Sequence, residues 1–118
     1  MDPRTIPAEL AAVLESFEKN LAEPVTPTTL ARRAKLAPAK FARLMHRFFD
    51  LTPSQFLTQT RLAAAARLLR QSDLGVAGIA FECGFYDHSA FSRAFHAAMG
   101  VTPSGYREAT REIASVDR

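Results

Sequence analysis

Apolar residues recur along the chain at the three- and four-residue spacing that places them on one face of a helix. The first such face, opposite a row of acidic residues, consists of Leu10, Val13, Leu14, Phe17 and Leu21. No stretch alternates polar and apolar residues as a half-buried strand does. The pattern therefore predicts an all-α fold of seven helices, over residues 7–22, 27–34, 38–49, 53–71, 75–83, 88–99 and 103–112.

Several of these helices have a recognisable start. Three begin at Thr-Pro pairs, namely Thr26-Pro27, Thr52-Pro53 and Thr102-Pro103. Thr can accept a hydrogen bond from the first free N–H groups, and Pro suits the next position because its missing donor would be unpaired there. Thr52 and Gln55 also have the spacing of a capping box. Asp87 can cap the helix after it, whereas Ala37 offers no capping oxygen.

Two stretches of the chain repeat each other. FARLMHRFFDLTPSQF (41–56) and FSRAFHAAMGVTPSGY (91–106) agree at six of sixteen positions. With one residue inserted at a turn, the likeness extends upstream to the pairs Leu30/Ile79, Ala31/Ala80, Ala34/Cys83 and Leu36/Phe85. Each copy is a short helix, a turn, a longer helix and a Thr-Pro restart. This is the layout of the helix-turn-helix, whose second helix enters a DNA major groove.

The second helix of each copy has an apolar stripe and an outward polar face. The stripes consist of Phe41, Leu44, Met45 and Phe48, and of Phe91, Ala94, Phe95 and Ala98. The outward faces consist of Ala39, Ala42, Arg43 and His46, and of Ser89, Ser92, Arg93 and His96. An Arg at the matching place in both faces can donate two hydrogen bonds to guanine, worth about 1–3 kcal/mol of discrimination. These faces predict sequence-specific contact with double-stranded DNA.

Charge and length agree with a DNA partner. Residues 28–107 hold eleven Lys and Arg against four Asp and Glu, although a solvated basic face would give the same balance. The helix expected at 53–71 would be about 27 Å long, near the ~34 Å between successive major grooves on one side of DNA. We therefore expect the chain to read two adjacent major grooves as a monomer.

Other classes of protein fit these residues less well. An enzyme needs paired carboxylates, a nucleophile with a base, a metal cluster or a phosphate-binding glycine loop, and the few acids of 28–107 are scattered. A helical module that binds protein would expose apolar residues where Arg43 and Arg93 stand. Non-specific coating of nucleic acid stays open, since it gives steep salt dependence without sequence preference. We expect no enzymatic activity, no cofactor and no metal.

The chain is expected to be cytoplasmic and free of the membrane. Its single cysteine, Cys83, cannot form an internal disulfide, and no apolar run approaches the roughly 18 residues of a membrane span. Cys83 pairs with Ala34 in the repeat, which favours a buried, inert thiol over a redox sensor. The three histidines lack a Cys or carboxylate cluster, which favours polar or phosphate-facing roles over metal binding.

The segment IAFECGFYDHSAFSRAFHAAMGVTPSGYR, residues 79–107, resembles the signature of the AraC/XylS family of bacterial transcription regulators. The resemblance continues through LARRAKLAPAKFARLMHRFF and LTPSQFLTQTRLAAAARLLRQSDL and covers roughly residues 25–107. It implies one DNA-binding domain over residues 1–118 that controls transcription. Its expected parts are a helix-turn-helix near 27–49, a linking helix near 53–71, a second helix-turn-helix near 75–99 and a closing helix near 103–112.

The resemblance also implies which residues contact DNA. Base-facing positions fall on Ala39, Ala42 and Arg43 in the first copy and on His88, Ser89, Ser92 and Arg93 in the second. Contacts with backbone phosphates are expected from Lys40, Arg47 and His96.

The first copy departs from the family pattern. Lys35 stands where the turn usually has Gly, and Ala37 where the helix cap is often Ser. Ala39 and Ala42 can touch a thymine methyl group but cannot form a hydrogen bond with a base. We therefore predict that the second copy, together with Arg43, leads sequence readout.

Most members of that family carry a separate sensing or dimerising domain, for which 118 residues leave no room. The chain is then either a stand-alone short regulator or, as we favour, the DNA-binding part of a longer protein. RNA polymerase is the further partner that the resemblance implies, with occlusion of a promoter as the alternative route of control.

Overall fold

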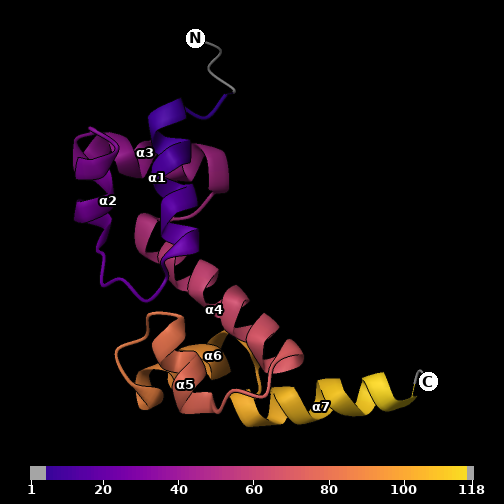
Figure 1. The fold of residues 1–118 in the computed structure, drawn as a ribbon. Coiled ribbons are helices and arrows are strands. Elements are labelled where there is room, and N and C mark those ends of the chain that lie inside the picture. Colours follow the sequence, from indigo (N-terminus) through magenta and orange to yellow (C-terminus); the bar gives the residue numbers. More distant parts are fainter. Residues whose placement is uncertain (1–4, 117–118) are drawn as a thin grey trace. The chain divides into compact units, whose positions relative to one another are not determined.

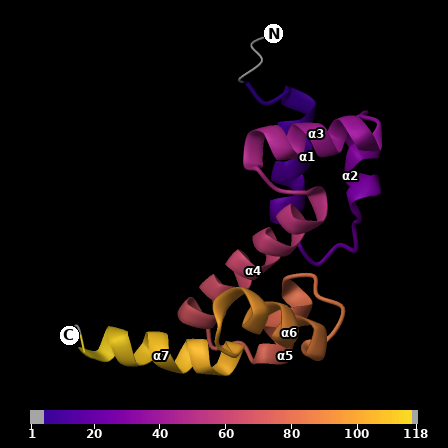
Figure 2. The ribbon, with the colours of Figure 1, turned by 180° about the vertical axis from the view of Figure 1, so that it is seen from behind.

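The structure is a computed structural model that describes residues 5–116, with side chains up to residue 114. The part of the chain that it describes contains seven α-helices and no strand, as predicted. Figures 1 and 2 show them as α1 (Ala8–Lys19), α2 (Pro27–Arg33), α3 (Pro38–Phe49), α4 (Pro53–Gln71), α5 (Val76–Glu82), α6 (His88–Met99) and α7 (Pro103–Val116). By their contacts the residues form two compact units, Met1–Thr60 and Arg61–Arg118.

The predicted helix starts are confirmed by hydrogen bonds. Thr26 and Thr102 each accept a bond from the backbone N–H three residues further on, at 3.2 and 3.0 Å. Thr52 and Gln55 form the expected capping box: Gln55 N donates to Thr52 Oγ1 at 3.1 Å, and Thr52 N donates to Gln55 Oε1 at 2.9 Å. The Thr-Pro pairs therefore begin α2, α4 and α7 for the reason that the sequence predicts.

The first unit packs α1, α2 and α3 with the start of α4 around one apolar core. Its buried residues are Leu10, Leu14, Phe17, Val25, Leu30, Ala31, Ala34, Phe41, Met45, Phe56 and Leu57. The predicted stripe is confirmed within α1, where Val13 also packs partly buried against this core. Leu21 packs there too, but it lies beyond the end of α1 at Lys19.

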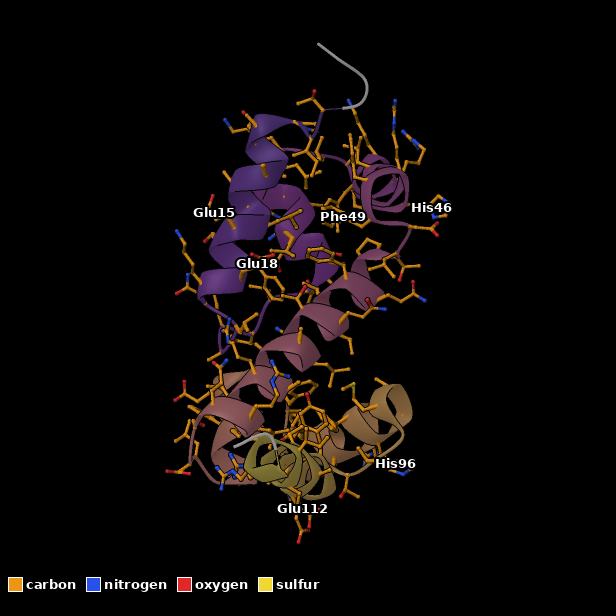
Figure 3. All side chains as sticks on the ribbon, turned by 90° about the vertical axis from the view of Figure 1, so that its right-hand side faces the viewer. Glu15, Glu18, His46, Phe49, His96 and Glu112 are labelled. Atoms are coloured by element: carbon orange, nitrogen blue, oxygen red, sulfur yellow. The ribbon has the colours of Figure 1, made fainter. Side chains whose placement is uncertain are left out.

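One position of the α3 stripe is predicted wrongly. Phe49, not Phe48, completes it, and its ring centroid lies 4.9 Å from that of Phe56. Figure 3 shows Phe49 pointing from α3 into this unit. Phe48 stays partly buried, with the Arg47 guanidinium 5.8 Å from its ring centroid.

The second unit packs the end of α4 with α5, α6 and α7. Its buried residues are Leu62, Ala65, Ala66, Leu69, Ile79, Ala80, Cys83, Phe91 and Phe95. An aromatic series runs through it, with centroid distances of 4.9 Å for Phe85–Phe91, 5.7 Å for Phe91–Phe95 and 5.4 Å for Phe95–Tyr106. Ala98, predicted in the stripe of α6, is exposed, because the core follows the i, i+4 pair Phe91 and Phe95.

Two arginines of α7 bind the end of α4 and the residues that follow it within the second unit. Arg107 donates from Nε to Leu69 O at 3.0 Å and from Nη2 to Ser72 O at 3.1 Å. Arg111 Nη2 donates to Ser72 O at 3.0 Å and to Asp73 Oδ1 at 2.8 Å. The last carbonyls of a helix lack partners within it, and the Arg107 guanidinium group supplies one to Leu69 O. Within the described residues, no helix is long and apolar enough to cross a membrane.

Candidate nucleic-acid interface

Both copies of the repeat fold as a short helix, a turn and a longer helix, in α2–α3 and in α5–α6. The first turn is closed by Lys35 N donating to Arg32 O at 3.0 Å and by Leu36 N donating to Ala31 O at 2.9 Å. The second copy makes the matching bonds at 3.1 and 3.0 Å, from Gly84 N to Phe81 O and from Phe85 N to Ala80 O. Two separate stretches of the chain thus build the same local frame for a recognition helix.

The two turns share a left-handed backbone conformation, for which the glycine of the second copy is better suited than the lysine of the first. Lys35 has φ +60° and Gly84 has φ +85°, both in the left-handed region. The helix ends repeat this contrast, with φ +56° at Asp50 after α3 and +77° at Gly100 after α6. A residue with a Cβ is disfavoured there, so the first copy holds two strained positions where the second has glycine.

Helix α3 presents most of its predicted DNA-contacting residues to solvent. Ala39, Lys40, Arg43 and Arg47 are exposed, and Ala42 is partly buried. In the part of the chain that the structure describes, neither Lys40 nor Arg43 forms a hydrogen bond or an ion pair. His46 points away from its unit in Figure 3, with Nδ1 3.7 Å from Asp50 Oδ1. Lys40 and Arg43 therefore keep their donors available for a ligand.

Helix α6 is capped as predicted and presents the matching face. Asp87 Oδ1 accepts a hydrogen bond from Ala90 N at 2.7 Å. Its predicted contact residues are exposed at His88, Ser89, Arg93 and His96 and partly buried at Ser92. Among the described residues, Arg93 has no hydrogen-bond or ion-pair partner, like Arg43 at the matching position of α3.

Other arginines have structural partners. Arg33 Nη2 lies 2.5 Å from Glu23 Oε1, and this hydrogen bond is the main cause that lowers the pKa of Glu23 and raises that of Arg33. On α4, Arg70 Nη1 donates to Tyr106 Oη at 2.6 Å, and burial lowers the pKa of Arg61. The Tyr106 partner of Arg70 lies 36 residues further along the chain, where helical periodicity gives no signal.

Two further exposed cations, Arg32 and Lys35, precede α3, and the sequence analysis did not propose them for DNA contact. Arg32 is in the last turn of α2. Lys35, in the turn after it, has its Nζ 3.8 Å from Glu9 Oε1, and both of these side chains are largely exposed. Their places beside the turn of a helix-turn-helix are the signal that could have identified them. They extend the basic character of the α3 face.

The predicted burial of Cys83 is confirmed. Its side chain is inside the core of the second unit. Burial, reinforced by Glu82 and opposed by Arg67, raises the pKa of the thiol to about 11. The thiol is thus protonated near neutral pH, which disfavours nucleophilic chemistry.

Comparison with known proteins places this geometry in a family. The helix-turn-helix domain family matches residues 30–109. The HTH-type transcriptional regulator CdhR of Pseudomonas aeruginosa is 36% identical over 96 residues, which are 81% of this chain and 29% of that protein. The HTH-type transcriptional activator RhaS of Escherichia fergusonii is 36% identical over 101 residues, 86% of this chain and 36% of that protein. The chain thus spans about a third of the length of these relatives.

Solved structures agree with this relationship. The DNA-binding domain of AdpA, described as a global transcriptional factor and solved with a target DNA, has a TM-score of 0.86 at 33% identity and covers 90% of this chain and 96% of its own. The C-terminal domain of AraT, a response regulator from Geobacillus stearothermophilus, has a TM-score of 0.80 at 26% identity and covers 87% of this chain and 86% of its own. The chain belongs to the AraC-type helix-turn-helix family, as its sequence signature predicts.

Proposed function

We propose that this chain is a DNA-binding unit of a transcription regulator, with α3 and α6 as recognition helices in successive major grooves of one duplex. The observation that carries the proposal is the pair of exposed arginines, Arg43 and Arg93, at matching positions of two helices in the same local frame. The likeness to the AdpA domain, solved with a target DNA, supports the same reading.

The proposed contacts divide into two kinds. Base edges are read by Ala39, Ala42 and Arg43 on α3 and by His88, Ser89, Ser92 and Arg93 on α6. Phosphates are held by Lys40, Arg47 and His96, to which the exposed Arg32 and Lys35 add charge. Phosphate contacts fix the position of a protein on the duplex, and contacts with base edges give sequence preference.

We also propose that the second copy, with Arg43 of the first, leads sequence readout. The face of α6 offers hydrogen-bonding groups at His88, Ser89 and Arg93, whereas two of the three base-facing residues of α3 are alanines. Alanine can only touch a thymine methyl group, so it discriminates less among bases than a bidentate arginine.

The partners beyond DNA follow from the family. The relatives named above are about three times as long as this chain, so we propose that a sensing or dimerising domain works beside it. Control of transcription would then proceed through contact with RNA polymerase or by occlusion of a promoter. A regulator of this kind acts in the cytoplasm, where bacterial chromosomal DNA is found.

Selection of bound duplexes from a random library, followed by affinity measurements over a range of salt, tests the proposal. We expect enriched duplexes with two short boxes centred about one helical turn apart, and an affinity that falls with salt. No enrichment with a steep salt dependence would indicate non-specific coating instead. No binding to any duplex would favour a helical protein-interaction module.

A further inference from the structure

The two copies of the helix-turn-helix carry opposite net charge. Residues 27–50 hold six Lys and Arg against one acid, whereas residues 75–100 hold one Arg against two acids. Five cations of the first copy face uncharged or acidic counterparts in the second, at Arg32/Phe81, Arg33/Glu82, Lys35/Gly84, Lys40/Ala90 and Arg47/Ala97. The second copy therefore lacks the cations with which the first would hold phosphates.

The second copy has instead one residue that the first does not. Leu36 and Phe85 make the same turn hydrogen bond, and Ala37 and Asp87 are the N-caps of α3 and α6. Ala37 follows Leu36 directly, but Tyr86 stands between Phe85 and Asp87. The insertion needed to align the two repeats is thus Tyr86.

Tyr86 has no role in the packing of its own unit. Its side chain is 95% exposed, the most exposed of the large apolar or aromatic side chains in the described part of the chain. Phe85, next to it, turns inward with its ring centroid 4.9 Å from that of Phe91. A phenol ring left in water at the start of a recognition helix has its hydroxyl group available to a ligand.

We infer that Tyr86 is a phosphate anchor of the second copy in addition to His96, with its hydroxyl group donating a hydrogen bond to the DNA backbone beside the start of α6. This inference rests on the proposed function. Tyr is one of the uncharged side chains that donate to phosphate oxygens, and its two side-chain torsions make it inexpensive to order. As a neutral donor, it takes the place of the cations that the second copy lacks.

The charges around Tyr86 are consistent with this role. Glu82 and Asp87 are acidic, but the Asp87 carboxylate is already bonded to Ala90 N at 2.7 Å, where the helix N-terminus offsets its charge. Tyr86 therefore stands beside a carboxylate whose charge is partly offset, and its neutral hydroxyl group can donate to a phosphate there.

The test compares Tyr86→Phe and Tyr86→Ala with the unchanged chain on its selected duplex, by fluorescence anisotropy at several salt concentrations. Tyr86→Phe removes only the hydroxyl group, and we expect roughly three- to tenfold weaker binding with an unchanged salt slope. Tyr86→Lys should recover affinity and steepen the slope by about 0.9, as one added phosphate contact predicts. Ile113→Ala, which changes an exposed apolar side chain of α7, is the matched control and should bind like the unchanged chain.

Three results would overturn the inference: Tyr86→Phe binding as tightly as the unchanged chain, Tyr86→Lys binding no better than Tyr86→Ala, or a lowered melting temperature for Tyr86→Phe. Each leaves the proposed function standing, provided that the unchanged chain still selects two-box duplexes. Failure of the unchanged chain to select any duplex would instead contradict the proposed function itself.

Discussion

At the scale of single residues, the cations of this chain differ in whether the fold has already engaged their donors. Arg107 binds the end of α4, Arg111 binds the two residues that follow it, and Arg33 binds Glu23. Lys40, Arg43 and Arg93 make no such bond within the described residues and stand on the exposed faces of α3 and α6. Free donors at matching positions are what make these side chains candidates for DNA contact.

The first prediction concerns Lys40 as a phosphate contact. Lys40→Ala should weaken binding to all duplexes alike and lower the salt slope by about 0.9, because one fewer counterion is released. Lys19→Ala is the control. Lys19 belongs to α1 and not to the α3 or α6 face, and its Nζ pairs with Glu15 at 3.2 Å. Affinities for the selected duplex and for a scrambled one, each over a range of salt, provide the measurement. A loss confined to one sequence would assign Lys40 to base readout instead.

The second prediction concerns the strained turn at Lys35. Its φ of +60° costs an L-residue roughly 1–2 kcal/mol of folding free energy. Glycine avoids this cost, but it loses more conformational entropy on folding, so only part of the cost is recovered. Lys35→Gly should therefore raise the free energy of unfolding by up to about 1 kcal/mol, as measured by urea denaturation.

Lys35→Ala is the control for that change, because it removes the same charge and leaves a Cβ at positive φ. It should bring no gain in stability, since the exposed pair with Glu9 contributes little. Equal stability of the glycine and alanine variants would show that backbone strain at this turn is negligible.

Some residue positions lay beyond what the sequence could predict. Spacing alone places Phe48 and Phe49 about equally well beside Phe41 and Met45, and the choice depends on where Phe56 of α4 stands. Ala98 is exposed for the same reason, because α6 packs along Phe91 and Phe95. The outward arginines were predictable because the repeat places them twice in the same register.

At the scale of helices, the starts were more predictable than the ends. Thr-Pro pairs and Asp87 carry a local chemical signal, and α3, α4 and α6 have the predicted bounds. Helix α1 is shorter than predicted, and α7 extends to Val116 rather than to residue 112. Helix ends depend on packing and on weaker signals, which a single sequence records poorly.

The third prediction concerns the capping of the two recognition helices. Ala37 makes no capping bond to α3, whereas Asp87 caps α6. Ala37→Ser should stabilise the chain by about 0.5–1 kcal/mol, and Asp87→Ala should destabilise it by about 1 kcal/mol. Chemical denaturation of both variants provides the measurement, with unfolding followed by circular dichroism. The two substitutions must change the free energy of unfolding in opposite directions. A loss of stability in Ala37→Ser would contradict the account of the α3 start.

At the scale of the whole molecule, the helix-turn-helix occurs twice, with different side chains on its two exposed faces. The first copy combines a basic surface with two alanines on its base-facing side, and the second combines hydrogen-bonding side chains with a net acidic segment. The repeat and the family signature predicted both copies before the fold was known. The contrast in charge between them is also present in the sequence. The matching hydrogen bonds of the turns show which residues of the two copies correspond, and so where the second copy lacks a cation.

The central claim is that each copy reads its own DNA box through its arginine. The most direct measurement is duplex selection repeated with Arg43→Ala and with Arg93→Ala, alongside the unchanged chain. We predict that each variant loses base preference at one position, in a different box. If both variants weaken binding uniformly and keep the full two-box preference, the arginines contact only the backbone and the claim is contradicted.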